Sequence, residues 1–413
     1  MDRIILHCDL NNFYASVECL YNPLIRDKPV AVCGSQEARH GIVLAKNYIA
    51  KAAGIKTGEA IWEAKNKCPN LVIVMPNYSL YLSYSRMARE IYERYTNQLE
   101  PFGIDESWLD VTESTTLFGS GEKIAHEIKE AIKNELGVTA SVGVSYNKIF
   151  AKLASDMKKP DAVTIITKEN YQRKVWSLPV QDLLYVGPST KRKLNKIGIM
   201  TIGELARISP LFLKNMLGIW GQSLYVFANG LDESPVHATS FESIIKSVGN
   251  SLTTPRDLLS IEDAHILIWV LSESVGERLR RHSLKGSTVQ ISIKSKDLEY
   301  IERQAPLSRP THITSEIANK ANEIFLKAWD WSKNIRALGV RATNVVTADT
   351  YIQLSLMEDD SQRIKKELLD HSVDKIRERF GHYSVQRAIL FKDTALNANP
   401  VEENVIHPVS YFK

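Results

Sequence analysis

Residues 4–18 of the chain read IILHCDLNNFYASVE, an apolar run that stops at Asp9 and continues into a helix-like segment. The run 4–8 has the length of a buried strand. A second stretch, 104–111 (IDESWLDV), alternates as a strand does and carries the acidic pair Asp105-Glu106. A carboxylate at a strand end beside an acidic pair on a neighbouring strand can hold two Mg²⁺ ions about 3.5 to 4 Å apart. An acidic pair near a turn is equally typical of a solvated turn, and sequence alone does not make the two stretches neighbours.

The surroundings of these two stretches mix strand and helix patterns. Short apolar runs predict strands at 30–33, 71–75 and 138–144, while periodic spacing predicts helices within 78–98 and over 121–136. This mixture predicts a sheet covered by helices over the first 166 residues.

Residues 167–242 have a different character. Helix-like runs within 183–205 and 213–230 are bracketed by the glycines Gly187, Gly198, Gly218, Gly221 and Gly230. This pattern is typical of two helix-hairpin-helix units, whose backbone N–H groups bind phosphate without reading a base. Ordinary helical hairpins also carry glycine at their turns, so both interpretations stay open.

The polar stretch 234–242 contains Pro235 and predicts a linker. Beyond it, strands at 247–253, 288–294 and 335–341 and helices at 261–281 and 315–328 predict a compact α+β domain with the order β-α-β and then α-β. The tail, 348–413, contains a helix-like segment, 362–380, that ends at Gly381.

The charge of the 413-residue chain is unevenly distributed. Its 52 Lys and Arg against 48 Asp and Glu give a net charge of +4. By segment, the basic and acidic residues number 19 and 20 over 1–166, 9 and 6 over 167–242, 15 and 11 over 243–347, and 9 and 11 over 348–413. A basic middle joined to a near-neutral first part is typical of a protein that does chemistry in one part and holds a polyanion with another, although a chance excess of solvated lysines would look the same.

Several classes are excluded by composition. No apolar run approaches the roughly 20 residues of a membrane-spanning helix, and the N-terminus does not have the form of a secretory signal, so we expect a cytoplasmic protein. The four cysteines lack a CxxC pair and clustered histidine partners, which argues against a zinc site or a disulfide framework.

Four ordered motifs resemble the signature segments of the Y-family DNA polymerases, and of their bacterial members above all: 9–18 (DLNNFYASVE), 45–48 (AKNY), 103–110 (GIDESWLD) and 145–160 (SYNKIFAKLASDMKKP). The resemblance covers residues 1 to about 345 and implies a multidomain α+β right-hand polymerase. Its parts would be a ferredoxin-like palm (1–10 and 77–166), small fingers (11–76), a helix-hairpin-helix thumb (167–233), a linker (234–242), an α+β little finger (243–347) and a C-terminal tail (348–413).

The resemblance also implies roles for individual residues. Asp9 and Asp105 would bridge two Mg²⁺ ions, the carbonyl of Leu10 would help to hold the nucleotide-bound ion, and Glu106 would complete the catalytic site. The implied nucleotide-binding residues are Phe13, the steric gate Tyr14, and the triphosphate contacts Tyr48, Lys51 and Lys159. Gly187, Lys191, Gly218 and Gly221 of the thumb would contact DNA.

The sequence departs from the family pattern at a few positions. Lys51 stands where arginine is common, Gly103 replaces a serine, Asn11 stands where an acidic or apolar residue is frequent, and Tyr185 stands where the first hairpin often has glycine. In the tail, 353–357 (QLSLM) resembles the pentapeptide that docks into the sliding clamp, through Gln353, Leu354, Leu356 and Met357. The alternation of Ile352, Leu354 and Leu356 also fits a terminal strand.

We therefore expect a monomeric, template-directed, low-fidelity DNA polymerase for translesion synthesis. It would use two-metal phosphoryl transfer without proofreading on primer-template DNA and deoxynucleoside triphosphates. Two other classes remain as alternatives. A nucleotidyl cyclase would use a palm-like acidic site without DNA, and a non-catalytic DNA-binding or clamp-binding scaffold would bind primer-template DNA without extending it.

Overall fold

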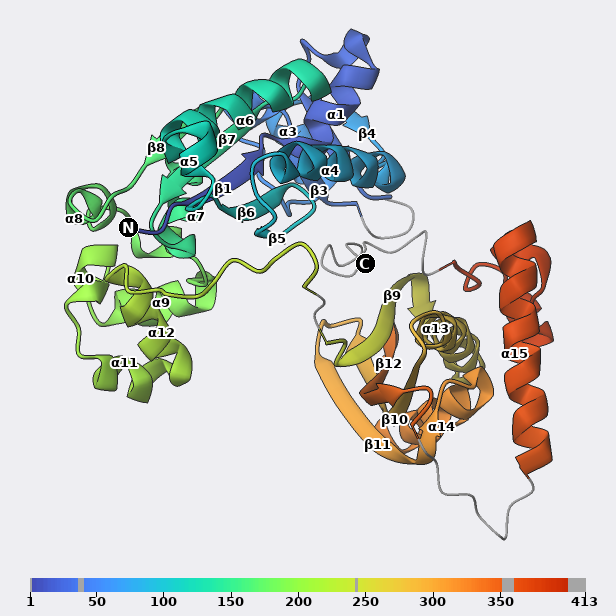
Figure 1. Ribbon diagram of the computed structural model, residues 1–413. Helices are drawn as coiled ribbons and strands as arrows, with labels where there is room; N and C mark the ends of the chain where they lie inside the picture. Colours follow the sequence, from blue (N-terminus) through green and yellow to red (C-terminus); the bar gives the residue numbers. More distant parts are fainter. Residues whose placement is uncertain (1, 36–40, 242–243, 351–359, 400–413) are drawn as a thin grey trace. The chain divides into compact units, whose positions relative to one another are not determined.

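The computed structural model describes residues 2–35, 41–241, 244–350 and 360–399, and its chain divides into two compact units (Figure 1). The first unit holds nearly all described residues up to 241, and the second holds those from 244 to 399. Each unit buries a large hydrophobic core of its own.

The first unit is built around a five-stranded sheet in the order β5-β6-β1-β7-β8. Its strands are β1 (Ile5–Leu10), β5 (Leu99–Pro101), β6 (Glu106–Asp110), β7 (Ala140–Ser145) and β8 (Val163–Ile165). The central strand β1 is fully buried and runs antiparallel to both β6 and β7. Alternate residues of a strand point to opposite faces.

The two faces of this sheet serve different purposes. Leu6, Cys8 and Leu10 of β1 join the core that also contains residues of α4 (Tyr78–Glu93) and α6 (Gly121–Leu136). His7 points the other way, toward α7 (Lys148–Met157), where its ring contacts Ser155. Asp9, two residues further along β1, shares the face of His7. The first face is therefore packed with apolar side chains, and the second carries the polar His7 and Asp9 beside a small apolar cluster.

Smaller elements complete the first unit. After β1 comes α1 (Phe13–Tyr21), and a three-stranded sheet in the order β3-β2-β4 has its own small core. Its elements are β2 (Val30–Cys33), β3 (Val43–Lys46), α2 (Tyr48–Ala52), α3 (Ile61–Lys67) and β4 (Val72–Val74), and α5 (Thr115–Phe118) precedes α6. In the predicted linker, Val236 is buried beside Ile5 and Trp108, so this stretch packs against the sheet.

The helical part of the first unit consists of α8 (Tyr171–Val175), α9 (Pro188–Lys196), α10 (Ile202–Ala206), α11 (Pro210–Leu217) and α12 (Ile219–Ala228). Gly198 separates α9 from α10 with φ +82°, and Gly218 separates α11 from α12 with φ +70°. Left-handed φ values suit glycine because it has no Cβ. Both predicted helix pairs with glycine turns are present.

The second unit is a four-stranded antiparallel sheet, β11-β10-β12-β9, packed against two helices. Its elements are β9 (Ser247–Leu258), α13 (Ile261–Arg281), β10 (Leu284–Ser295), β11 (Tyr300–Thr311), α14 (Thr314–Ala328) and β12 (Ile335–Thr347). The predicted order, β-α-β and then α-β, is wrong because it lacks β11. This edge strand is largely exposed and contains Pro306 and Pro310, residues that an edge strand tolerates but that hide a strand pattern.

The tail contributes a long helix to the second unit, α15 (Asp360–Phe380), which packs against α13. Its bounds agree closely with the predicted helix over 362–380. None of the helices among the described residues has the length and apolar character that crossing a membrane requires.

Candidate active site

The acidic residues predicted from the two strand ends lie side by side. Asp9 of β1 and Glu106 of β6 are direct cross-strand partners, so their side chains leave the same face of the sheet. Asp105 precedes β6, and its backbone carbonyl accepts a hydrogen bond from the Leu10 amide at 3.0 Å. The fold therefore gathers all three carboxylates and the backbone of Leu10 at one corner, where β1 ends and β6 begins.

Burial and mutual repulsion oppose the ionisation of two of these carboxyl groups. Burial, followed by the charges of Asp9 and Glu106, raises the pKa of Asp105 to about 7. Burial also raises the pKa of Asp9 to about 6, against the attraction of the Lys159 ammonium. A divalent cation would stabilise both anionic forms. The donor set at this corner, carboxylates with a backbone carbonyl nearby, is the oxygen-rich one that Mg²⁺ prefers.

Glu106 differs from these two acids because its pKa is lowered rather than raised. Burial alone would raise its pKa, but hydrogen bonds and charge from His7 and Lys152 outweigh burial and lower the pKa to about 2. The Lys152 ammonium forms an ion pair with this carboxylate, and His7 Nε2 lies 3.3 Å from Glu106 Oε2. Burial lowers the pKa of His7, and its contact with Glu106 acts in the opposite direction. His7 Nδ1 lies 2.8 Å from the Ser155 hydroxyl, which orients the ring.

Lys159 reaches the same acidic corner from the residues after α7. Its ammonium forms ion pairs with Asp9 Oδ2 and Asp156 Oδ1, each at 2.8 Å. The resemblance implied a triphosphate contact for Lys159. In the structure, without a nucleotide, two carboxylates balance its charge.

Tyr14 stands at the beginning of α1 with its ring stacked on Tyr81 of α4. The ring centroids are 4.3 Å apart and the planes differ by 10°. Tyr78 meets Tyr14 edge-on at 6.0 Å, and Phe13 is buried with its ring tilted against Tyr14 at 5.7 Å. Burial raises the pKa of Tyr14, and the charge of Asp105 adds to that effect. Three aromatic rings thus hold the Tyr14 ring in place beside the acidic corner.

Tyr48 and Lys51 lie on the short helix α2, whose first turn is capped by Asn47. The Asn47 side chain accepts a hydrogen bond from Ala50 N at 3.0 Å and from Val30 N at 3.1 Å, which ties α2 to β2. Lys51 Nζ lies 5.6 Å from the centroid of the Tyr48 ring. Burial raises the pKa of Tyr48, on which the charges of Lys159 and Asp9 also act. Tyr48 therefore lies close enough to Lys159 and Asp9 for their charges to influence its pKa.

The glycines predicted to contact DNA divide into two kinds. Gly187 precedes α9, and a Cβ there would meet nothing within 4 Å, so its backbone is open. The Lys191 amide donates to the Gly187 carbonyl at 2.9 Å, which closes the first turn of α9. A Cβ on Gly221, in contrast, would lie 2.0 Å from the Leu213 carbonyl oxygen. Gly221 is thus explained by the close approach of α11 and α12.

Tyr185 occupies the position in the first hairpin where the family pattern often has glycine. Tyr185 has a left-handed φ of +70°, a conformation that costs a residue with a Cβ roughly 1 kcal/mol. Its half-exposed ring packs beside Trp220 at 5.3 Å and Phe227 at 6.1 Å. These aromatic contacts hold Tyr185 in the conformation that glycine would adopt freely.

Sequence reasoning missed several residues at the acidic corner. His7, Lys152 and Ser155 support Glu106, and Tyr78 and Tyr81 support Tyr14. Lys152 and Ser155 fall inside the quoted motif 145–160, three positions apart on one helix face, which is the available signal. The suggested clamp residues Gln353, Leu354, Leu356 and Met357 lie outside the described residues.

Comparisons with known proteins agree with one another. The sequence profile of the impB/mucB/samB family matches residues 8–156, and that of its C-terminal domain matches residues 245–356. DNA polymerase IV of Acetivibrio thermocellus is 66% identical over 397 residues, which are 96% of this chain and the whole of that protein. DNA polymerase IV 2 of Halalkalibacterium halodurans is 38% identical over the full length of both chains, and DNA polymerase IV 2 of Bacillus subtilis is 37% identical over 94% of each.

The fold has a counterpart among solved structures. A Y-family DNA polymerase chimera superposes with a TM-score of 0.74 at 24% sequence identity, covering 83% of this chain and 99% of the chimera. The multidomain α+β fold class predicted from the motifs is thereby confirmed.

Proposed function

The chain belongs to the Y family of DNA polymerases, and from this premise we propose how its residues divide the work of template-directed DNA synthesis. The protein is a DNA-directed DNA polymerase of the translesion type, and its reaction is a metal-dependent nucleotidyl transfer on DNA and deoxynucleoside triphosphates. The assignments of residues and domains that follow are proposals, and the observation that carries them is the meeting of Asp9, Asp105 and Glu106 at the ends of β1 and β6.

We assign the cation site to the acidic corner. Asp9, Asp105, Glu106 and the Leu10 carbonyl would together hold two Mg²⁺ ions. Bound Mg²⁺ ions stabilise the attacking and leaving oxygens of a phosphoryl transfer. The raised pKa values of Asp9 and Asp105 support the assignment, because two acids that resist ionisation together are suited to sharing cations.

His7 and Lys152 would act as positioning residues for Glu106. The contact with His7 and the ion pair with Lys152 lower the pKa of Glu106 to about 2, so this carboxylate stays charged throughout the neutral range. Since His7 is buried and its ring contacts Ser155, the Glu106 carboxylate is held from β1 as well as from α7. Preorganised groups of this kind spend no reorganisation energy at the moment of reaction.

The nucleotide would lie between the acidic corner and α2. Tyr48, Lys51 and Lys159 would contact its triphosphate, where positive charge stabilises the phosphoryl oxygens in the transition state. Lys159, which is paired with Asp9 in the structure, would pair with the phosphates when the nucleotide binds. Tyr14, backed by Tyr81 and flanked by Phe13, would exclude a 2′-hydroxyl by steric clash.

The domain divisions implied by the resemblance give each part a task. The five-stranded sheet would be the palm, the three-stranded sheet the fingers, and the paired helices with their glycine turns the thumb. Gly187 and Lys191 would contact DNA phosphate at the open beginning of α9, with Gly218 at the second hairpin. The sheet and two helices of the second unit would be the little finger, and residues 353–357 would dock to a sliding clamp.

Primer extension with Asp105→Asn tests the assignment of the catalytic carboxylates. This change keeps the size of the side chain and removes its charge, so we expect extension in Mg²⁺ to fall by at least about a thousandfold. Asp27→Asn, at an exposed position, is the matched control and should retain full activity. Full activity of Asp105→Asn would contradict the proposal. Binding of primer-template without extension by the wild-type chain would favour a scaffold, and formation of cyclic nucleotide without DNA would favour a cyclase.

A further inference from the structure

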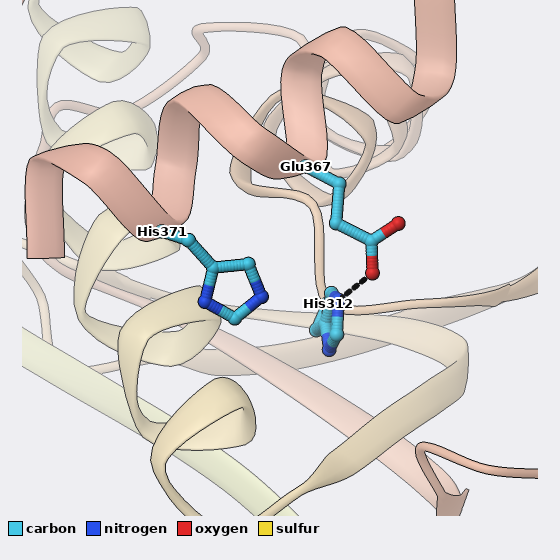
Figure 2. Close-up of side chains that lie close together, drawn as sticks. All are labelled: His312, Glu367 and His371. Carbon is cyan, nitrogen blue, oxygen red and sulfur yellow. Dashed lines mark hydrogen bonds and ion pairs between the residues drawn. The ribbon is translucent and has the colours of Figure 1, made fainter. Parts of the chain in front are cut away.

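A second cluster of metal-ligating side chains lies in the second unit, and the polymerase reaction does not use it. Its members are His312, Glu367 and His371 (Figure 2). One potential ligand atom from each lies within 4.8 Å of the other two, and among the described residues this is the only group of three that meets this condition. His312 Nε2 and Glu367 Oε1 are 2.6 Å apart. The ring of His371 is turned toward both of them (Figure 2).

Two elements supply the cluster. Glu367 and His371 are four positions apart on α15, so they share one face of the helix. His312 lies between the end of β11 and the beginning of α14. The two histidines are distant in the sequence, and the docking of the tail helix brings them together.

The segment that carries His312 is held from both sides. Arg280 Nη1 of α13 donates a hydrogen bond to the His312 carbonyl at 2.7 Å. Asp370 Oδ2 of α15 accepts a hydrogen bond from the Thr314 amide at 2.7 Å, and it thereby caps the N-terminus of α14. The backbone on either side of His312 is fixed, which limits where its ring can point.

The rotation of α15 is fixed by buried ion pairs. Arg280, with only 4% of its side chain exposed, pairs with Asp374 at 2.5 Å and with Asp370 at 3.3 Å. Arg377 pairs with Glu273 of α13 at 2.9 Å. Residues 370, 374 and 377 recur at helical spacing on the face that carries Glu367 and His371. These pairs set both the register and the orientation of the two ligands from α15.

The donor atoms suit a transition-metal ion. Two imidazoles and one carboxylate form a ligand set that Zn²⁺ accepts, whereas Mg²⁺ and Ca²⁺ prefer oxygen ligands alone. His371 is exposed, so an ion can enter. The positive charge of Arg280 is balanced by Asp370 and Asp374 and does not bar a cation.

We propose that His312, Glu367 and His371 bind one Zn²⁺ ion, or a transition-metal ion of similar ligand preference, that fastens α15 to the segment between β11 and α14. The ion would replace the direct contact between His312 and Glu367 and add a bond to His371. A fourth ligand position would be open to water. The site would stabilise the docking of the tail and take no part in phosphoryl transfer.

Zn²⁺ titration of the full-length chain by equilibrium dialysis, with Mg²⁺ in excess to occupy the catalytic carboxylates, tests the site. We expect one tightly bound Zn²⁺ per chain. His371→Ala should weaken the binding by more than about tenfold, while primer extension stays unchanged. Two matched controls, Glu378→Gln on the same helix and His126→Ala on α6, should bind Zn²⁺ as the wild type does; both positions are exposed. Equal Zn²⁺ binding by the wild type and His371→Ala, or no Zn²⁺ binding by the wild type, would overturn the proposal.

Hydrogen exchange gives a second readout that does not depend on activity. Because the ion would join α15 to the beginning of α14, Zn²⁺ should slow amide exchange in both segments of the wild-type chain. The same addition should leave exchange in His371→Ala unchanged, and since this side chain is exposed, the variant is expected to fold. An equal effect of Zn²⁺ on the two proteins would place the bound ion elsewhere and refute the site.

Discussion

Burial and the charges of Asp9 and Glu106 raise the pKa of Asp105 to about 7, and this shift couples the ionisation of Asp105 to the stability of the first unit. An unfolded aspartate has a pKa of about 3.9. The folded chain therefore binds the proton more tightly than the unfolded chain does. Asp105 contributes stability in its protonated form at low pH, and this contribution is lost as the pH rises from about 4 to about 7. At neutral pH the site is destabilised in the charge state that its chemistry requires.

Asp105→Asn should therefore stabilise the protein while it abolishes activity. In EDTA at about pH 8 we expect its free energy of unfolding to exceed that of the wild type by about 1–3 kcal/mol, because the variant carries no buried charge at this position. The difference should shrink near pH 4, where the wild-type carboxyl is protonated, and again at neutral pH with Mg²⁺. Denaturant unfolding measures the effect. A difference that does not vary with pH would show that charge is not its cause, and Asp27→Asn should change stability by less than about 0.5 kcal/mol.

Tyr81 gives a residue-scale test of how the sugar is recognised. If Tyr14 excludes the 2′-hydroxyl, its position depends on the Tyr81 ring stacked behind it at 4.3 Å. Tyr14→Ala should lower the ratio of kcat/KM for deoxynucleotides to that for ribonucleotides by at least about tenfold, and Tyr81→Leu should lower the ratio by about threefold to tenfold. Steady-state incorporation measures both.

Tyr81→Phe is the matched control for this test. It removes only the hydroxyl that donates to Glu18 at 2.5 Å and keeps the stacked ring, so discrimination should be retained. Unchanged discrimination in both Tyr14→Ala and Tyr81→Leu would place the gate elsewhere.

At the scale of elements, α7 determines the geometry of the acidic corner because it lies directly on the sheet. Three side chains of this helix contact the sheet: Lys148 contacts Glu100 of β5, Lys152 contacts Glu106 of β6, and Ser155 contacts His7 of β1. Gly143 of β7 allows this close approach, since a Cβ there would lie 1.9 Å from the Ala151 carbonyl oxygen and 2.5 Å from the Ser155 amide. Both contacts are with backbone, which cannot rotate away.

Gly143→Ala should displace α7 and so damage stability and activity together. We expect a loss of about 1–3 kcal/mol in the free energy of unfolding from overpacking. Primer extension should also fall, because Lys152 moves with the helix. Gly187→Ala is the control for stability, since a Cβ there meets nothing within 4 Å and φ is not left-handed. If Gly143→Ala unfolds like the wild type, the close packing of α7 is not what fixes the corner.

The elements also show what a sequence pattern can predict. β2 was predicted with its bounds because a continuous apolar run reports a strand that is buried throughout, and α6 because its apolar spacing reports burial on one face. β11 was missed because only Ile301, Ala305 and Leu307 of this strand pack against the core, and prolines and charged residues interrupt their spacing. The helix α15 was predicted, but its docking was not, since Arg280 and Asp374 attract each other only after the fold brings them together.

The candidate site divides in the same way. Asp9, Asp105 and Glu106 could be named from their motifs, and so could Tyr14. Their supports, His7 and Tyr81, carry no motif, because a histidine in a strand and a tyrosine in a helix are ordinary core residues. Their significance depends on distances of 3.3 Å to Glu106 and 4.3 Å to Tyr14, which only the fold creates.

At the scale of the whole molecule, ion pairs within the second unit change how much of each segment's charge is available to bind DNA. Residues 243–347 carry 15 basic and 11 acidic residues, yet some of these arginines are not available to DNA. Arg280 is paired with Asp370 and Asp374 of α15, Arg256 with Asp393, and Arg309 with Asp360. The acidic excess of the tail thus neutralises arginines of the same unit. The positive charge that this unit can offer to phosphates is smaller than its composition indicates.

Asp370→Ala tests whether the tail helix is part of the second unit or an appendage to it. Asp370, 4% exposed, accepts hydrogen bonds from Thr314 N at 2.7 Å and Arg387 at 3.1 Å and pairs with Arg280. Its loss leaves a buried guanidinium short of a partner and a helix N-terminus uncapped, at a cost of about 3–5 kcal/mol. Hydrogen exchange should therefore accelerate in α13 and α14 as well as in α15, and stay unchanged in β1, β6 and β7 of the first unit. Glu378→Ala, at an exposed position of α15, should change none of these rates. Acceleration confined to α15 would show that the tail only rests on a domain that is complete without it, whereas acceleration across all three helices means that the second unit folds as one cooperative body with its tail included.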